Sequence, residues 1–343
     1  MSLRAMGMFG AVALCGVALC VPRGLAEKSQ AGSAAGADVS SLVATGKRQF
    51  NQGDYATSLA TLRSAIAQNA GNAEARYWLG RGYYEIRDYD NAIAALEKAT
   101  ALDSQNSGYH QWLGRAYGGK ADRDHSFFLA RKVKKEFQTA VRLGPSNISA
   151  RRDLEEYCLD APWIVGGSKD EALAQVNAIA ALDPIEGRLA RAFYDLEGLK
   201  KPADAALEYR AVLAASPNRM EPYLEAISFF SSQNSPSDMQ TAIQAAARIN
   251  SSDLRLVFYR GVEGVLSGAD ASGAEEDLKS YLARAPQRSD WPSHAAAREW
   301  LGWLYEAEGK RMDAAEQYRA ALQLDPQRSD ARARLQKLEK AGP

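Results

Sequence analysis

The chain has 343 residues and carries 42 Lys and Arg against 42 Asp and Glu, so its formal net charge is zero. Apolar residues make up 46% of the chain and charged residues 24%, which is typical of a folded soluble protein and excludes a largely disordered one. The even charge balance predicts no nucleic-acid partner and no attraction of the whole surface to acidic lipid.

Residues 1–26 have the pattern of a secretory signal peptide. Arg4 precedes an apolar run at 7–21, and the small residues Gly24 and Ala26 stand at the −3 and −1 positions of a cleavage site. We expect cleavage before Glu27, export to the periplasm or the medium, and no integral membrane span in the mature form. An uncleaved N-terminal anchor is the alternative.

Residues 27–38 are small and polar, which predicts a flexible linker. Cys15 and Cys20 would leave with the signal peptide, so only Cys158 would remain and the mature monomer could form no internal disulfide. Cys158 lies within a helical pattern, and we expect a buried, unreactive thiol there.

A helical hairpin pattern begins at residue 39 and is clearest at 73–106. There Leu79, Gly80 and Tyr83 share one face of a first helix, and apolar positions of a second helix recur at Ala92, Leu96 and Ala99. The 34-residue length, the Leu-Gly-x-x-Tyr core and the Ala, large apolar, Ala pattern resemble the tetratricopeptide repeat.

The pattern predicts eight repeats, strongest in the first, second and eighth. They span residues 39–72, 73–106, 107–147, 148–185, 186–219, 220–253, 254–288 and 295–328. Residues 329–343 follow as a charged capping helix. The resemblance implies an all-α, right-handed α-solenoid of antiparallel hairpins, with a concave groove lined by the first helices. The chain also resembles a group of uncharacterised exported bacterial proteins with such repeats.

Repeats three and four contain extra residues. In the third, the second helix arrives seven residues late, so we expect 118–125 to form a lengthened corner. In the fourth, Ala161-Pro162 ends the first helix, and Ser168 with Glu171 forms a capping box that opens the second. We expect the two sets of extra residues to be neighbours in space.

Three cations recur at one place in the first three repeats. Lys47, Arg81 and Arg115 are 34 residues apart, and each follows the glycine of a first helix. The resemblance places them on the groove floor. Phe50, Tyr77 and Tyr84 would be apolar walls on the same helix faces. Such a row suits an acidic peptide segment or a C-terminal carboxylate. The family's carboxylate clamp has an asparagine where Lys47 stands, and a solvated helix face is the alternative.

The sequence offers little for catalysis. His110, His125 and His294 lack a second ligand at helical spacing, so we expect no metal and no cofactor. Gly166-Gly167-Ser168-Lys169 lacks the full phosphate-loop pattern and is interpreted as a helix start. The pair Phe127-Phe128 is expected to pack between repeats.

We therefore predict a non-catalytic scaffold that binds a protein or peptide in its concave groove, in an envelope assembly or trafficking complex. The alternative is an accessory protein that holds a small acidic ligand or cell-wall fragment in a pocket closed by loops 118–128 and 161–168. A third hypothesis is a hydrolase built on Cys158 with His125, which a buried sulfur would exclude.

Overall fold

The computed structural model describes residues 38–340, so the predicted signal peptide and all of the linker except Asp38 lie outside the described residues. Within them every regular element is helical. The elements are α1 Val39–Asn51, α2 Tyr55–Gln68, α3 Ala73–Glu85, α4 Tyr89–Leu102, α5 Ser107–Asp124, α6 Phe127–Leu143, α7 Ile148–Asp160, η1 Trp163–Val165, α8 Lys169–Leu182, α9 Pro184–Phe193, η2 Tyr194–Gly198, α10 Pro202–Ala214, α11 Glu221–Ser232, α12 Pro236–Asn250, α13 Leu254–Ser267, α14 Ala271–Arg284, α15 His294–Ala307, α16 Arg311–Leu324 and α17 Ser329–Lys340.

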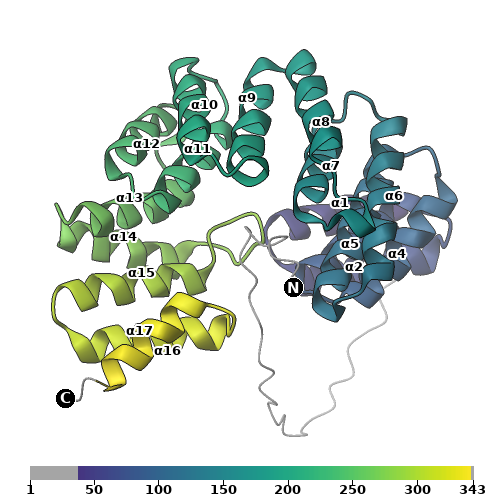
Figure 1. Cartoon of the computed structure of the whole chain (residues 1–343). Helices are drawn as coiled ribbons and strands as arrows, with labels where there is room; N and C mark the ends of the chain where they lie inside the picture. The colour runs from purple at the N-terminus through teal and green to yellow at the C-terminus, as the bar shows by residue number, and fades with distance from the viewer. Residues whose placement is uncertain (1–37, 341–343) are drawn as a thin grey trace, which may run out of the picture.

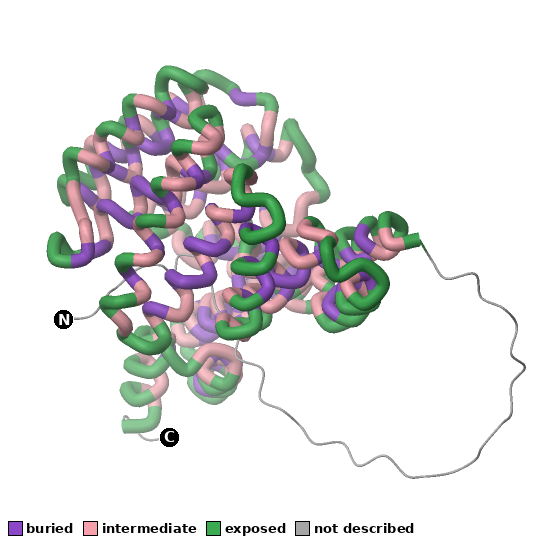
Figure 2. Tube along the Cα trace, turned by 90° about the vertical axis from the view of Figure 1, so that its right-hand side faces the viewer, coloured by how far each residue is buried: buried purple, intermediate pink, exposed green. Residues whose placement is uncertain are grey.

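Successive helices pair into antiparallel hairpins that stack into a curved solenoid (Figure 1). The first helices of neighbouring hairpins contact one another, from α1 with α3 through to α13 with α15. They therefore form the inner row, and the second helices form the outer row. This confirms the predicted all-α, right-handed α-solenoid. Figure 2 shows buried segments running along the contacts between helices, because a hairpin buries its apolar face only against its neighbours.

Glycines set how closely the two helices of a hairpin approach. A Cβ built on Gly80 would lie 2.5 Å from Leu96 Cγ, which leaves no room for a side chain. The same relation recurs along the array. The pairs are Gly46 with Leu62, Gly80 with Leu96, Gly114 with Phe137, Gly261 with Leu278, and Gly302 with Tyr318. A large side chain on the second helix thus fills the space left by a glycine on the first.

The third hairpin differs from the sequence prediction. Residues 118–124 are not a loop but the last turns of α5, and only His125 and Ser126 separate α5 from α6. Gly119 lies against the Tyr89 ring, where a Cβ would be 2.5 Å from Cε1. Close packing therefore keeps this glycine-rich stretch helical, and the left-handed backbone of His125, at φ 50°, ends the helix.

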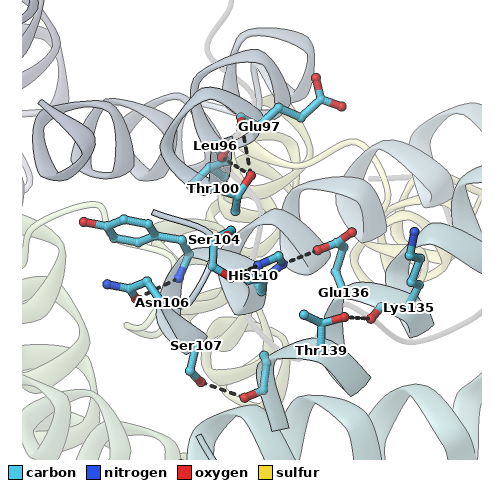
Figure 3. Close-up of polar contacts among 12 residues, drawn as sticks. Leu96, Glu97, Thr100, Ser104, Asn106, Ser107, His110, Lys135, Glu136 and Thr139 are labelled. Atoms are coloured by element: carbon cyan, nitrogen blue, oxygen red, sulfur yellow. Dashed lines mark hydrogen bonds and ion pairs between the residues drawn. The ribbon is translucent and has the colours of Figure 1, made fainter. Parts of the chain in front are cut away.

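Polar contacts join the start of α5 to the C-terminal part of α6 (Figure 3). Ser107 Oγ donates to the Ala140 carbonyl at 2.8 Å, and His110 Nδ1 lies 2.6 Å from a Glu136 carboxylate oxygen. Glu136 is the only acid of α6. Its carboxylate is thus turned towards α5 and not towards solvent.

The fourth corner, residues 161–168, is tied to the start of α6. Tyr157 Oη lies 2.7 Å from the Ala130 carbonyl oxygen and 2.8 Å from that of Val165, and Lys134 Nζ donates to the Gly166 carbonyl at 2.7 Å. These contacts join the fourth corner to α6 and not to residues 118–125, so the expected proximity of the two sets of extra residues stays a prediction. Only half of the predicted capping box forms at Ser168, because the Glu171 side chain pairs with Lys134 at 2.6 Å.

The solenoid curves far enough for the segment before α15 to reach the first hairpin (Figure 1). Arg288 Nη1 donates to the Asn51 carbonyl at 2.5 Å, and the Ser289 amide donates to Glu85 at 3.3 Å. At the other end, α17 lies on α16 and carries the Arg319–Glu339 ion pair at 2.7 Å. Among residues 38–340, no helix has both the length and the apolarity needed to cross a bilayer.

Candidate functional site

Cations and indole rings alternate along the inner row of the first three hairpins. Lys47 Nζ lies 5.1 Å from the Trp78 ring centre, and Arg81 Cζ lies 4.3 Å from Trp78 and 4.2 Å from Trp112. Arg115 Cζ lies 4.7 Å from the same Trp112 ring centre. We call these five residues the cation–indole ladder. Each contact lies within the range of a cation–π interaction.

The repeat builds this ladder. Trp78 and Trp112 stand three residues before Arg81 and Arg115, which places each indole and cation on one helix face. Because α1, α3 and α5 stack side by side, indoles and cations from neighbouring helices alternate along the inner row. The repeat spacing predicts the three cations as site residues, but both indoles were missed. The 34-residue separation of Trp78 and Trp112 is the sequence signal that could have identified them.

Arg81 is the central cation of the ladder. Its guanidinium also lies 4.7 Å from the Phe50 ring centre and 5.6 Å from that of Tyr77. Among residues 38–340 it forms no ion pair, and its Nε is buried without a hydrogen-bond partner. Burial lowers the pKa of Arg81 from its usual value. A guanidinium held by aromatic faces and lacking a carboxylate is suited to receive an anionic group.

Arg115 is not a free cation, contrary to the predicted row of three. Its Nε and Nη2 donate to the two carboxylate oxygens of Asp153 at 2.8 and 2.9 Å. Burial alone would lower the pKa of Arg115, but the Asp153 carboxylate more than offsets burial and raises it. This bidentate pair joins α5 to α7. It also neutralises the positive charge of Arg115, which the sequence pattern predicted would bind a ligand.

Lys47 stands at the exposed end of the ladder and has no ion pair among the described residues. An open hollow of about 450 Å³ lies beside it, with Asp38, Asn72 and Glu74 on its other walls. The walls of the hollow therefore include both basic and acidic side chains. The hollow extends the inner surface towards the N-terminal end of the array.

The three predicted wall residues lie mostly beneath the ladder. Phe50 is 3% exposed and packs edge-on to Trp78 at 5.3 Å. Tyr84 packs edge-on to Trp112 at 5.5 Å, and burial raises its pKa above the usual value. Tyr77 is half-buried against Trp78. These rings hold the indoles and Arg81 in place.

The large apolar side chains at the fourth corner and at the start of α6 are exposed to solvent. Phe127 and Phe128 are exposed, contrary to the expectation that they pack between repeats, and so are Trp163 and Ile164. Together with the helical conformation of 118–124, this argues against the predicted pocket for a small acidic ligand.

The sulfur of Cys158 is unsuited to nucleophilic catalysis. The residue is 2% exposed, and burial raises the pKa of its thiol to about 12. His125, the proposed base, lies at the exposed turn before α6. The thiol-hydrolase hypothesis is therefore excluded. Within residues 38–340 no group of three or more His, Cys, Asp or Glu side chains is placed to hold a metal ion.

A charged cluster lies next to the ladder, between α7 and α11. Arg152 Nη2 contacts Glu225 at 2.9 Å, and Arg152 Nε lies 3.9 Å from Glu155. Glu155 is fully buried, and neither of its carboxylate oxygens has a hydrogen-bond partner. Burial raises the pKa of Glu155 from 4.5 to about 8. The folded state therefore binds this proton more tightly than the unfolded state does.

Glu155→Gln should make stability less dependent on pH. The stabilising effect of the bound proton is fully present below about pH 4.5 and is lost as the pH rises through about 8. The melting temperature of the variant, relative to wild type, should therefore rise steadily between pH 5 and pH 8 in thermal melts. Glu316→Gln, at an exposed outer position, is the control. A difference in melting temperature between Glu155→Gln and wild type that stays constant across this range would contradict the buried, protonated state of Glu155.

The comparisons with known proteins agree with this architecture. A family model described as tetratricopeptide repeat matches residues 43–107 and 266–329. The structure of yeast Tom70 aligns with 92% of this chain and 66% of that one, with a TM-score of 0.63 and 12% identity. The fold and the site define a helical-hairpin solenoid of the kind that serves as a scaffold for protein–protein interactions. The chain contains tetratricopeptide repeats at residues 43–107 and 266–329, where the family model matches.

Two other solved structures are similar to it. TTC0263, a protein of this kind from Thermus thermophilus, has 19% identity and a TM-score of 0.44, and the match covers 61% of this chain and 97% of that one. The C-terminal part of a repeat-containing protein from Cytophaga hutchinsonii has 14% identity and a TM-score of 0.40, with 84% and 97% covered. No curated protein sequence matches significantly.

Proposed function

We propose that this protein is a non-catalytic adaptor that binds an acidic peptide segment of a partner protein on the inner surface of its first three hairpins. Arg81 receives a carboxylate of the segment. Lys47 adds long-range attraction at the exposed end of the ladder, and Trp78 and Trp112 offer apolar contact. The N-terminal sequence pattern alone supports an exported setting, in an assembly or trafficking complex of the cell envelope.

The observation that carries this proposal is the contrast between Arg81 and Arg115. Both are held by indole faces at equivalent repeat positions, but among residues 38–340 only Arg115 has a carboxylate partner, at 2.8 Å. The contact between Arg115 and the Asp153 carboxylate supports this proposal. A peptide carboxylate would supply Arg81 with the group that Asp153 supplies to Arg115.

An extended peptide suits the site better than a compact ligand does. The ladder runs across three first helices, and stacked helices lie about 8–10 Å apart. An extended chain advances about 3.3 Å per residue, so a short segment can follow the ladder from Lys47 to Trp112. Side-chain or terminal carboxylates of one segment can then reach Arg81 and Lys47 together.

Selection from a library of random displayed peptides tests the proposal. Peptides retained by the wild-type protein should be enriched in Asp and Glu at a fixed position, and Arg81→Gln should lose that enrichment. A parallel selection on Lys98→Gln, which removes a cation from an exposed position on the outer helix α4, should give the wild-type result. Selected peptides without acidic enrichment, or an unchanged selection on Arg81→Gln, would refute the assignment.

A further inference from the structure

Phe127–Phe128 at the start of α6 and Trp163–Ile164 in η1 are exposed apolar segments on neighbouring elements, and together they present an apolar surface to solvent. Tyr157 Oη joins the two elements that carry these segments, because it lies within 2.8 Å of the carbonyl oxygens of Ala130 on α6 and Val165 on η1. The four side chains are 57%, 70%, 84% and 55% exposed. They include every exposed Phe and Trp among residues 38–340. We call this surface the aromatic corner.

Backbone hydrogen bonds and close packing define the turn that carries Trp163 and Ile164. The Ser168 amide donates to the Cys158 carbonyl at 2.8 Å, and the Gly167 amide donates to the Pro162 carbonyl at 3.1 Å. A Cβ on Gly167 would lie 1.8 Å from the Ala161 oxygen, so the backbone is closely packed here. Val165 is buried beneath the turn. Trp163 and Ile164 are therefore held outwards by a fixed turn.

Unpaired cations border the aromatic corner. Arg131 and Lys135 follow Phe127 at successive turns of α6 and are exposed, and neither forms an ion pair among residues 38–340. Lys132 Nζ lies 5.4 Å from the Phe128 ring. Glu136, the only acid of α6, faces His110 instead (Figure 3). At the fourth corner the exposed Asp170 adjoins Lys169.

We propose that the aromatic corner docks on the surface of an anionic lipid bilayer. Indole and phenyl rings partition into the interfacial region of a bilayer, where exposed aromatic side chains gain apolar contact. Cations beside them reach the acidic headgroups, and their own stems remain in apolar contact. Local charge, not the neutral charge of the whole chain, directs this docking. The geometry is that of a protein lying on a membrane.

This docking is compatible with the proposed peptide adaptor. The ladder uses the inner row of α1, α3 and α5, and the aromatic corner uses the start of α6 and the turn after α7. A membrane-bound array would thus keep its inner surface open to a partner. Neither proposal depends on the other.

Co-sedimentation with vesicles tests the docking. Wild-type protein should bind vesicles of mixed phosphatidylglycerol and phosphatidylcholine, and bind vesicles of phosphatidylcholine alone much more weakly. Trp163→Ser with Phe128→Ser should weaken binding to the anionic vesicles about tenfold, because apolar contact scales with buried area. Arg131→Gln with Lys135→Gln should weaken it by about tenfold or more and remove most of its salt dependence.

Met312→Ser is the matched control, since Met312 is 87% exposed on α16, outside the aromatic corner. All samples keep the same N-terminal sequence, so any contribution of residues 7–21 is common to them. Thermal melts should be unchanged in every variant. A blue shift of tryptophan fluorescence on binding should shrink in Trp163→Phe. Equal vesicle binding by wild type and both double variants, or no binding by wild type, would overturn the proposal and point to a protein partner at this corner.

Discussion

Arg81→Gln should weaken binding of an acidic peptide selected on this protein by about 10- to 100-fold, since a charge-assisted hydrogen bond contributes about 1.5–3 kcal/mol. The reason is the position of the guanidinium. It is held between Trp78 and Trp112 at 4.3 and 4.2 Å and has no carboxylate of its own among the described residues. Fluorescence anisotropy of the labelled peptide measures the change.

Two further variants separate charge from geometry. Arg81→Lys keeps the cation but loses the planar, bidentate group, so its loss of affinity should be intermediate. Lys98→Gln removes one exposed cation from α4 and should leave affinity within about twofold, because distant surface charges are screened. Equal losses in Arg81→Gln and Lys98→Gln would mean that net charge, not the ladder, determines binding.

Phe137→Ala should lower the free energy of unfolding by about 3–5 kcal/mol, the usual cost of removing a fully buried phenyl ring. Phe137 is 0% exposed and fills the space beside Gly114, where even a Cβ would lie 2.6 Å from its ring. Its ring also packs edge-on to Tyr157, at 6.4 Å between centroids. The substitution therefore leaves a cavity between the third and fourth hairpins. Urea denaturation followed by circular dichroism measures the change.

Phe128→Ala on the same helix is the matched control. Phe128 is 70% exposed, so its removal should change the free energy of unfolding by no more than about 0.5 kcal/mol. The two variants delete the same side chain and differ only in burial. Similar denaturation midpoints for both would show that the third hairpin is packed in another register than the structure gives.

The architecture could be predicted because one packing rule repeats. The spacing of Gly80 and Leu96 alone predicts their contact, because a glycine on the first helix leaves room for a large residue on the second. Gly114 and Phe137 obey the same rule although seven extra residues intervene. The lengthened stretch at 118–124 was wrongly predicted as a corner. Glycine disfavours helix, but the contact of Gly119 with Tyr89 overrides that preference.

The candidate site was predicted only in part. The 34-residue spacing identified Lys47, Arg81 and Arg115, because it depends on the repeat itself. The partner of Arg115 could not be predicted, since Asp153 comes from the next hairpin, beyond the insertion that shifts the register. Apolarity at Phe127 and Phe128 indicated burial. In the structure these two side chains lie at the start of the lengthened helix α6, where no neighbour among the described residues covers them. Apolarity alone could not predict that exposure.

Photo-cross-linking tests the central claim most directly. An acidic peptide selected on wild-type protein is given a diazirine next to its acidic residue and irradiated in complex, and the linked protein residues are mapped by mass spectrometry. We expect cross-links on α1, α3 and α5, concentrated around Arg81 and the two indoles of the ladder. Cross-links that fall instead on the outer helices α2, α4 and α6 would contradict the assignment of the inner surface as the binding site.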